Sequence, residues 1–151
     1  MSKTCKHNRM TEVLPHLWIG GTKKHMEYTD NGKQTTYIRS VERKPRDLNL
    51  LTRYFVCRNY SVPSIPLGYW KLEVLHYEVN ANYNVTTIVT DLGGHGRSGL
   101  YCAIIMAHVL GISGQEAIAR LRQMHCEQAV ETPEQEAYVV RIADELRNWK
   151  G

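Results

Sequence analysis

Residues 87–103, TIVTDLGGHGRSGLYCA, constrain the fold of this chain more than any other stretch of its 151 residues. A β-branched run leads into a glycine-rich segment, and an apolar pattern with helical spacing follows directly. A strand, a tight loop and a helix in direct succession are typical of layered α/β domains, in which loops at strand ends carry functional groups. We therefore expect a buried strand at 86–91 and a helix from about Ser98 to Leu110, ended by Gly111.

The rest of the sequence extends this arrangement to a single domain over residues 1–151. Strands are predicted at 12–21, at 51–57 and within a hairpin at 27–42, whose turn is Asn31-Gly32. Helices are predicted at about 64–80 with Pro66 in the first turn, from Ser113 with Glu116 in a capping box, and from Thr132 with Pro133 and Gln135. Because strands come mostly first and helices mostly last, we expect an α/β fold with a central mixed sheet flanked by helices.

Composition and charge argue against several classes of protein. The net charge of +4 comes without a dense Lys/Arg stripe, so nucleic acid is not an expected partner. The longest apolar run, 100–112, is too short to span a bilayer, and the first ten residues do not resemble a signal peptide. The four cysteines form no CxxC pair, so we expect neither a disulfide framework nor a metal site, and a cytoplasmic location.

The glycine-rich loop has two interpretations. Gly94, Gly96 and Gly99 match the dinucleotide-binding pattern, but that site needs a second strand ending in an acid about 20 residues later. A helical pattern occupies that region instead. A phosphate cradle fits better, because glycines let backbone N–H groups converge on one anion at the start of a helix. The predicted phosphate-binding residues are Leu92, Gly93, Gly94, His95, Gly96 and Arg97, whose guanidinium suits phosphate oxygens.

The segment TDLGGHGRSG resembles the active-site loop of the cysteine-dependent protein tyrosine and dual-specificity phosphatases, which reads His-Cys, five residues, Arg, then Ser or Thr. Three further stretches are similar to this family: VLPHLWIGG to its opening strand, NYSVPS to its Asp-x-x-x-Pro acid loop, and QAVETPEQEAYV to the segment bearing its water-positioning glutamine. The resemblance covers about 13–21 and 55–146. It implies the fold of that family and no cofactor.

The resemblance assigns roles to three residues of this chain. Arg97 falls on the phosphate-binding arginine, Ser98 on the hydroxyl that assists the leaving thiolate, and Gln135 on the glutamine that places the hydrolytic water. Three chemical positions are changed, and one of them is the histidine that precedes the nucleophile in the family, where this chain has Thr90. The nucleophilic cysteine position holds Asp91, and the general-acid position holds Asn59.

No other cysteine can replace the missing nucleophile. The loop requires an arginine six residues after the cysteine, and Cys57, Cys102 and Cys126 have Pro63, His108 and Thr132 there. We expect Asp91 to act as an internal anion, hydrogen-bonded to loop amides and paired with Arg97, in the place of a phosphate.

Three interpretations of the chain follow, and they leave open whether it is an enzyme. The first is a pseudophosphatase, a catalytically impaired member acting as a binding or regulatory module for a phosphoprotein or other protein partner. The second is an active phosphatase whose cysteine was replaced deliberately. In the third, Asp91 itself takes the phosphoryl group, a reaction that usually relies on metal ions, and no second acidic cluster is visible to hold Mg²⁺.

Overall fold

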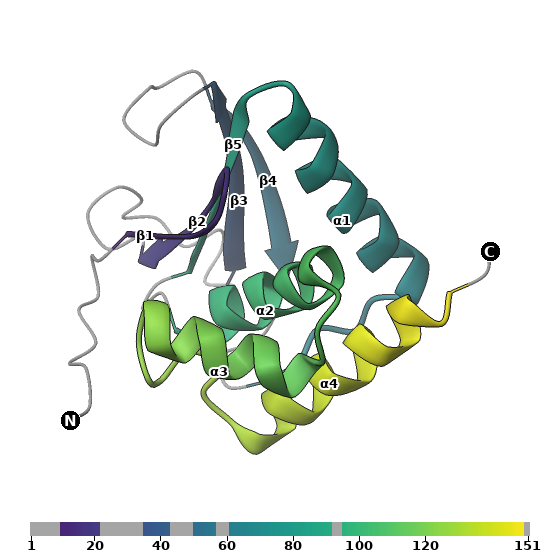
Figure 1. Cartoon of the computed structure of the whole chain (residues 1–151). Coiled ribbons are helices and arrows are strands. Elements are labelled where there is room, and N and C mark those ends of the chain that lie inside the picture. The colour runs from purple at the N-terminus through teal and green to yellow at the C-terminus, as the bar shows by residue number, and fades with distance from the viewer. Residues whose placement is uncertain (1–9, 22–34, 43–49, 57–60, 92–94, 150–151) are drawn as a thin grey trace.

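A five-stranded mixed sheet and four helices make up the fold in the computed structural model, which describes residues 10–21, 35–42, 50–56, 61–91 and 95–149 (Figure 1). The strands are β1 (Thr11–Leu14), β2 (Leu17–Gly21), β3 (Thr35–Glu42), β4 (Leu50–Val56) and β5 (Val85–Asp91). The helices are α1 (Leu67–Asn82), α2 (Gly96–Leu110), α3 (Gly114–Met124) and α4 (Pro133–Arg147).

The sheet has the order β1-β2-β5-β3-β4. Only β2 and β5 are parallel, with Gly21 opposite Asp91, and the other pairs are antiparallel. This arrangement confirms the expected mixed sheet and places β5 at its centre. The carboxyl end of β5, which leads to the glycine-rich loop, therefore lies beside the end of β2.

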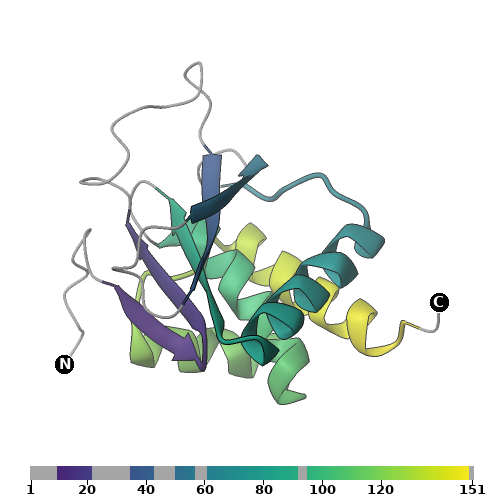
Figure 2. The same cartoon turned by 90° about the horizontal axis from the view of Figure 1, so that it is seen from above.

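Helix α2 is the central helix of the molecule, with α1, α3 and α4 around it (Figures 1 and 2). Every residue from Gly96 to Ala107 is buried, which explains its almost continuous apolar sequence. Trp70 of α1 links the outer helices, because its Nε1 donates to the Tyr138 hydroxyl of α4 over 2.8 Å. Gly111 ends α2 in the left-handed conformation, with φ 66°, as the sequence predicted.

The helix signals in the sequence are largely confirmed. Thr132 and Gln135 form a complete capping box at the start of α4, and the Ser113 hydroxyl accepts the N–H of Glu116 at the start of α3. Helix α1 begins and ends slightly later than predicted, and Pro66 is its N-cap rather than part of its first turn.

The single strand predicted at 12–21 is wrong. It is two antiparallel strands, because the chain turns at Pro15 and at His16, which has φ 66°. The strand within the predicted hairpin is β3, but its Asn31-Gly32 turn lies outside the described residues. Among the described helices, none is long and apolar enough on its own to cross a membrane, although α2 and α3 meet the length and composition criteria together as a pair bent by 117°.

Candidate functional site

The carboxylate of Asp91 lies at the end of β5 and faces the start of α2. Its Oδ2 accepts the backbone N–H of Ser98 over 2.9 Å and lies 3.8 Å from Nε of Arg97. Asp91 is 1% exposed and Arg97 3%. The expected pairing of these two side chains is therefore an ion pair rather than a hydrogen bond, since 3.8 Å exceeds hydrogen-bond distance. A helix N-terminus stabilises such a carboxylate in the same way as it stabilises a phosphate.

The first turn of α2 also holds buried polar groups that no described residue satisfies. Nε and Nη1 of Arg97 and Oγ of Ser98 have no hydrogen-bond partner in the described part of the chain. Buried N–H groups without a hydrogen-bond acceptor are costly even in a side chain that has an ion-pair partner, and native proteins rarely leave them so. Together with the N-terminal end of α2, these atoms form a set of donors that an oxyanion would satisfy.

The phosphate-binding residues predicted from the sequence are placed in part. His95, Gly96 and Arg97 lie at the beginning of α2, and all three are buried. Leu92, Gly93 and Gly94, like the general-acid position Asn59, lie outside the described residues.

The segment that contains Ala129 and Val130, just before α4, contacts the start of α2, and its backbone is strained. Val130 has φ 60°, a conformation that costs a β-branched residue on the order of 1–3 kcal/mol. Its N–H donates to the carbonyl oxygen of His95 over 3.1 Å, and the same oxygen accepts the N–H of Gly99. A Cβ on Gly99 would lie 2.7 Å from Val130 N, so only glycine permits this contact. The glycine that resembles part of a dinucleotide pattern is thus required for packing.

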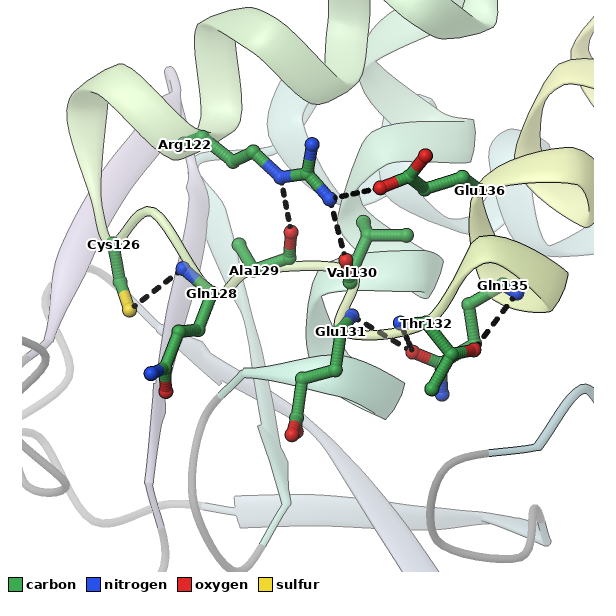
Figure 3. Close-up of polar contacts among 9 residues, drawn as sticks. All are labelled: Arg122, Cys126, Gln128, Ala129, Val130, Glu131, Thr132, Gln135 and Glu136. Carbon is green, nitrogen blue, oxygen red and sulfur yellow. Dashed lines mark hydrogen bonds and ion pairs between the residues drawn. The ribbon is translucent and has the colours of Figure 1, made fainter.

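Arg122 of α3 fixes this segment in place (Figure 3). Its Nε donates to the carbonyl oxygen of Ala129 over 2.9 Å, and its Nη2 donates to that of Val130 and to Glu136 Oε1, both over 2.6 Å. Hydrogen bonds from a charged donor contribute more than neutral ones. The strained conformation of Val130 is therefore maintained by Arg122, a residue that the sequence analysis did not single out.

The side chain of Gln135 is engaged in structural bonds. Its Oε1 accepts the N–H groups of Glu131 and Thr132, and its Nε2 donates to the carbonyl oxygen of Ser61 over 2.9 Å. Figure 3 shows the bonds to the α4 cap. The residue that the family resemblance assigns to water positioning thus joins the start of α4 to the segment that resembles the acid loop. Its role in placing water stays a prediction.

A second carboxylate lies at the same place. A Cβ on Gly96 would meet Oε1 of Glu131 at 2.9 Å, so this carboxylate lies directly over the first residue of α2. No local pattern predicts this contact, because Glu131 is close to Gly96 only through the fold. Two acids, Asp91 and Glu131, therefore approach the start of one helix.

The described cysteines do not supply a nucleophile. Burial, and secondarily the charge of Asp91, raise the pKa of the Cys102 thiol far above its ordinary value, so this residue is a core side chain. Cys126 is disulfide-bonded, contrary to the expectation from the spacing, and its sulfur lies 3.4 Å from Nδ1 of His95. No group of three or more His, Cys, Asp or Glu within the described ranges could hold a metal ion.

Sequence comparison identifies relatives without a known role. No protein-family model matches the sequence. Two uncharacterized proteins of Methanocaldococcus jannaschii are 31% and 33% identical to the chain over 94 residues, which is 62% of its length. The chain spans 55% and 60% of the length of these two relatives.

Solved structures show a consistent likeness. The active form of the phosphatase Tk-PTP is 25% identical with a TM-score of 0.51, over 59% of this chain and 58% of that one. Kinase-associated phosphatase with serine in place of its catalytic cysteine is 22% identical with a TM-score of 0.54, over 63% and 53%. The human tyrosine phosphatase-like serine/threonine/tyrosine-interacting protein is 15% identical, with a TM-score of 0.63 over 95% and 100% of the two chains. The chain therefore has the α/β fold of the tyrosine and dual-specificity phosphatases.

Proposed function

We propose that this chain is a member of the tyrosine and dual-specificity phosphatase family that does not turn over phosphate esters and acts as a binding or regulatory module. A phosphoprotein or another protein is the proposed partner, and the cytoplasm is the proposed location. The observation that carries the proposal is the buried carboxylate of Asp91 at the start of α2, 2.9 Å from Ser98 N.

Asp91 opposes the reaction in two ways. A carboxylate is a weaker nucleophile toward phosphorus than a thiolate, and this one is held by a hydrogen bond and an ion pair. It also repels the substrate, since two unit charges 4 Å apart interact with about 4 kcal/mol at an effective dielectric constant near 20. Glu131, over Gly96, adds to the same repulsion.

The general-acid position supports the proposal independently. Asn59 cannot donate a proton to a departing oxygen, and loss of a general acid alone lowers the rate by about 10²–10⁴. The unsatisfied donors of Arg97 and Ser98 favour a site that can still accept an oxyanion. Weakened binding of an oxyanion, without turnover, is the behaviour that combines these features.

The test is phosphate release from a phosphotyrosine peptide, measured for the chain with Asp91 and for Asp91→Cys. We expect no release from the chain with Asp91 and slow release from the variant, because the cysteine restores the nucleophile while the amide of Asn59 is not acidic enough to protonate the leaving group. Asp91→Ser is the matched control, since it removes the carboxylate without adding a thiol. This variant should release no phosphate. Phosphate release by the chain with Asp91, at a rate abolished by Asp91→Asn, would contradict the proposal and would favour direct use of Asp91.

A further inference from the structure

One face of α1 is apolar and exposed. Tyr69, Leu72, Leu75, Val79 and Tyr83 are 41%, 52%, 52%, 47% and 75% exposed. The opposite face of the helix packs into the core through Trp70, Val74 and Tyr77. A helix that is apolar on both faces is typical of one covered on both sides. Figures 1 and 2 show α1 along the outside of the helical layer.

The exposed apolar side chains lie along one stripe of the helix, which also contains the half-exposed His76. At about 100° per residue, the five positions fall within an arc of roughly 120°, and at 1.5 Å per residue they extend over about 21 Å. We call Tyr69, Leu72, Leu75, Val79 and Tyr83 the α1 stripe. A group of large exposed apolar side chains on one face of a domain is typical of an interaction site.

The charges beside the stripe argue against a lipid surface as its partner. Membrane-surface helices carry several Lys or Arg residues along the polar side. Helix α1 has a single basic residue other than histidine, Lys71, and one exposed acidic residue, Glu78, because Glu73 is buried against Tyr101. This balance suits a protein partner better than an anionic membrane.

The same charges point to a second copy of this chain. Lys71 and Glu78 are seven residues apart, so they lie two turns from each other on the same flank of the α1 stripe. A two-fold axis that pairs α1 with α1 in antiparallel orientation places Lys71 of each chain beside Glu78 of its partner. The same pairing brings Leu72 opposite Val79 and Tyr69 close to Tyr83, with Leu75 at the centre.

We infer that the α1 stripe is the contact of a symmetric antiparallel homodimer. An isologous contact needs a surface complementary to itself, and the stripe meets this requirement in its apolar positions and in its flanking charges. A single helix pair is smaller than a standard interface of about 800 Å² per partner, so we expect a dissociation constant on the order of 10–100 µM.

The test is sedimentation velocity on the full chain over a range of concentrations, with charge variants designed for the antiparallel pairing. Lys71→Glu and Glu78→Lys each replace two attractive pairs by two repulsive ones, and should each raise the dissociation constant roughly tenfold. The double variant Lys71→Glu/Glu78→Lys should restore the dimer. An equimolar mixture of the two single variants should form a mixed dimer more readily than either variant alone.

Two controls test whether a change in the dissociation constant comes from the α1 contact, rather than from a change in net charge or from unfolding. Arg120→Glu and Glu145→Lys change exposed charges on α3 and α4 by the same amounts and should leave the dissociation constant unchanged. Leu75→Glu should abolish dimerisation while the circular dichroism spectrum stays native. A chain that remains monomeric up to millimolar concentration, or that dimerises equally well with Leu75→Glu, would overturn the inference and leave the α1 stripe to a different protein.

Discussion

Gly99 of α2 and Val130 of the segment before α4 are in backbone contact, and a Cβ on the glycine would lie 2.7 Å from the valine nitrogen. This contact sets the distance between the start of α2 and the strained segment that supports it. The positions of the buried donors of Arg97 and Ser98 depend on that distance, because these two residues and Gly99 belong to the first turn of α2.

Gly99→Ala should therefore lower the free energy of unfolding by about 2 kcal/mol or more, since the added methyl group meets backbone atoms that cannot move aside cheaply. Gly68→Ala in α1 is the matched control. Its Cβ would meet only Trp149 at 4.0 Å, and removal of a helical glycine should stabilise the protein by about 0.5–1 kcal/mol. Urea unfolding of both variants measures the two effects, and equal effects would contradict the packing role of Gly99.

Arg122→Met should destabilise the protein by about 2–3 kcal/mol, because it removes charged hydrogen bonds to the carbonyl groups of Ala129 and Val130. Arg120→Met, which removes an exposed ion pair with Glu116, should cost less than about 0.5 kcal/mol. Thermal unfolding compares the two variants. If Arg122→Met were as mild as Arg120→Met, the strained conformation of Val130 would have to be maintained by its neighbours alone.

Asp91→Asn should increase the affinity for inorganic tungstate, a phosphate mimic, by roughly 10–100-fold, because it removes one repelling charge while keeping the shape of the side chain. Isothermal titration calorimetry measures the change. Glu131→Gln should give a smaller increase, since Glu131 is partly exposed and solvent screens its charge. An unchanged affinity in Asp91→Asn would mean that the anion does not bind next to Asp91.

Stability should fall between pH 7 and pH 5 in a manner that depends on His108. Burial, followed by the charge of Lys71, lowers the pKa of His108 from its ordinary value of 6.5. The unfolded chain therefore binds a proton here at a higher pH than the folded chain does, and folded stability is lost as the pH falls below about 6.5. His108→Gln should flatten the melting temperature against pH over this range. The other histidines are present in both proteins, so the difference between the two profiles reports His108.

Cys102 should not react with a thiol reagent in the native protein. Its pKa is raised by burial, and its side chain has no exposed surface. Ellman's reagent should modify it only in denaturant. Rapid modification of Cys102 in the absence of denaturant would show that α2 separates readily from its neighbours. The position of α2 at the centre of the fold argues against this.

The elements with strong local signals could be predicted from the sequence. The caps at Ser113 and Thr132, the glycine at 111 and the apolar run of β5 each depend on neighbouring residues, and they place α2, α3, α4 and β5 well. The break between β1 and β2 could not be predicted in the same way. Pro15 and His16 interrupt an otherwise continuous strand pattern, and the turn follows from the pairing of β2 with β5.

The candidate site could be predicted only where its residues are close in sequence. Asp91, Arg97 and Ser98 follow from one loop, and the structure brings them together. The contact of Glu131 with Gly96 and the bonds of Arg122 join segments that are separated along the chain. No spacing rule connects such residues, because the packing of α2 against the segment before α4 determines their distance.

The bonds of Gln135 bear on how sequences of this kind are interpreted. The side chain of Gln135 completes the cap of α4 and also binds Ser61, so it contributes to the stability of the fold independently of any reaction. Selection for a stable fold alone would retain Gln135 in a protein of this fold that had lost phosphatase activity. A glutamine at this position is therefore a poor indicator of catalytic activity. A sequence survey that counts it among catalytic residues would classify inactive members of the fold as active enzymes.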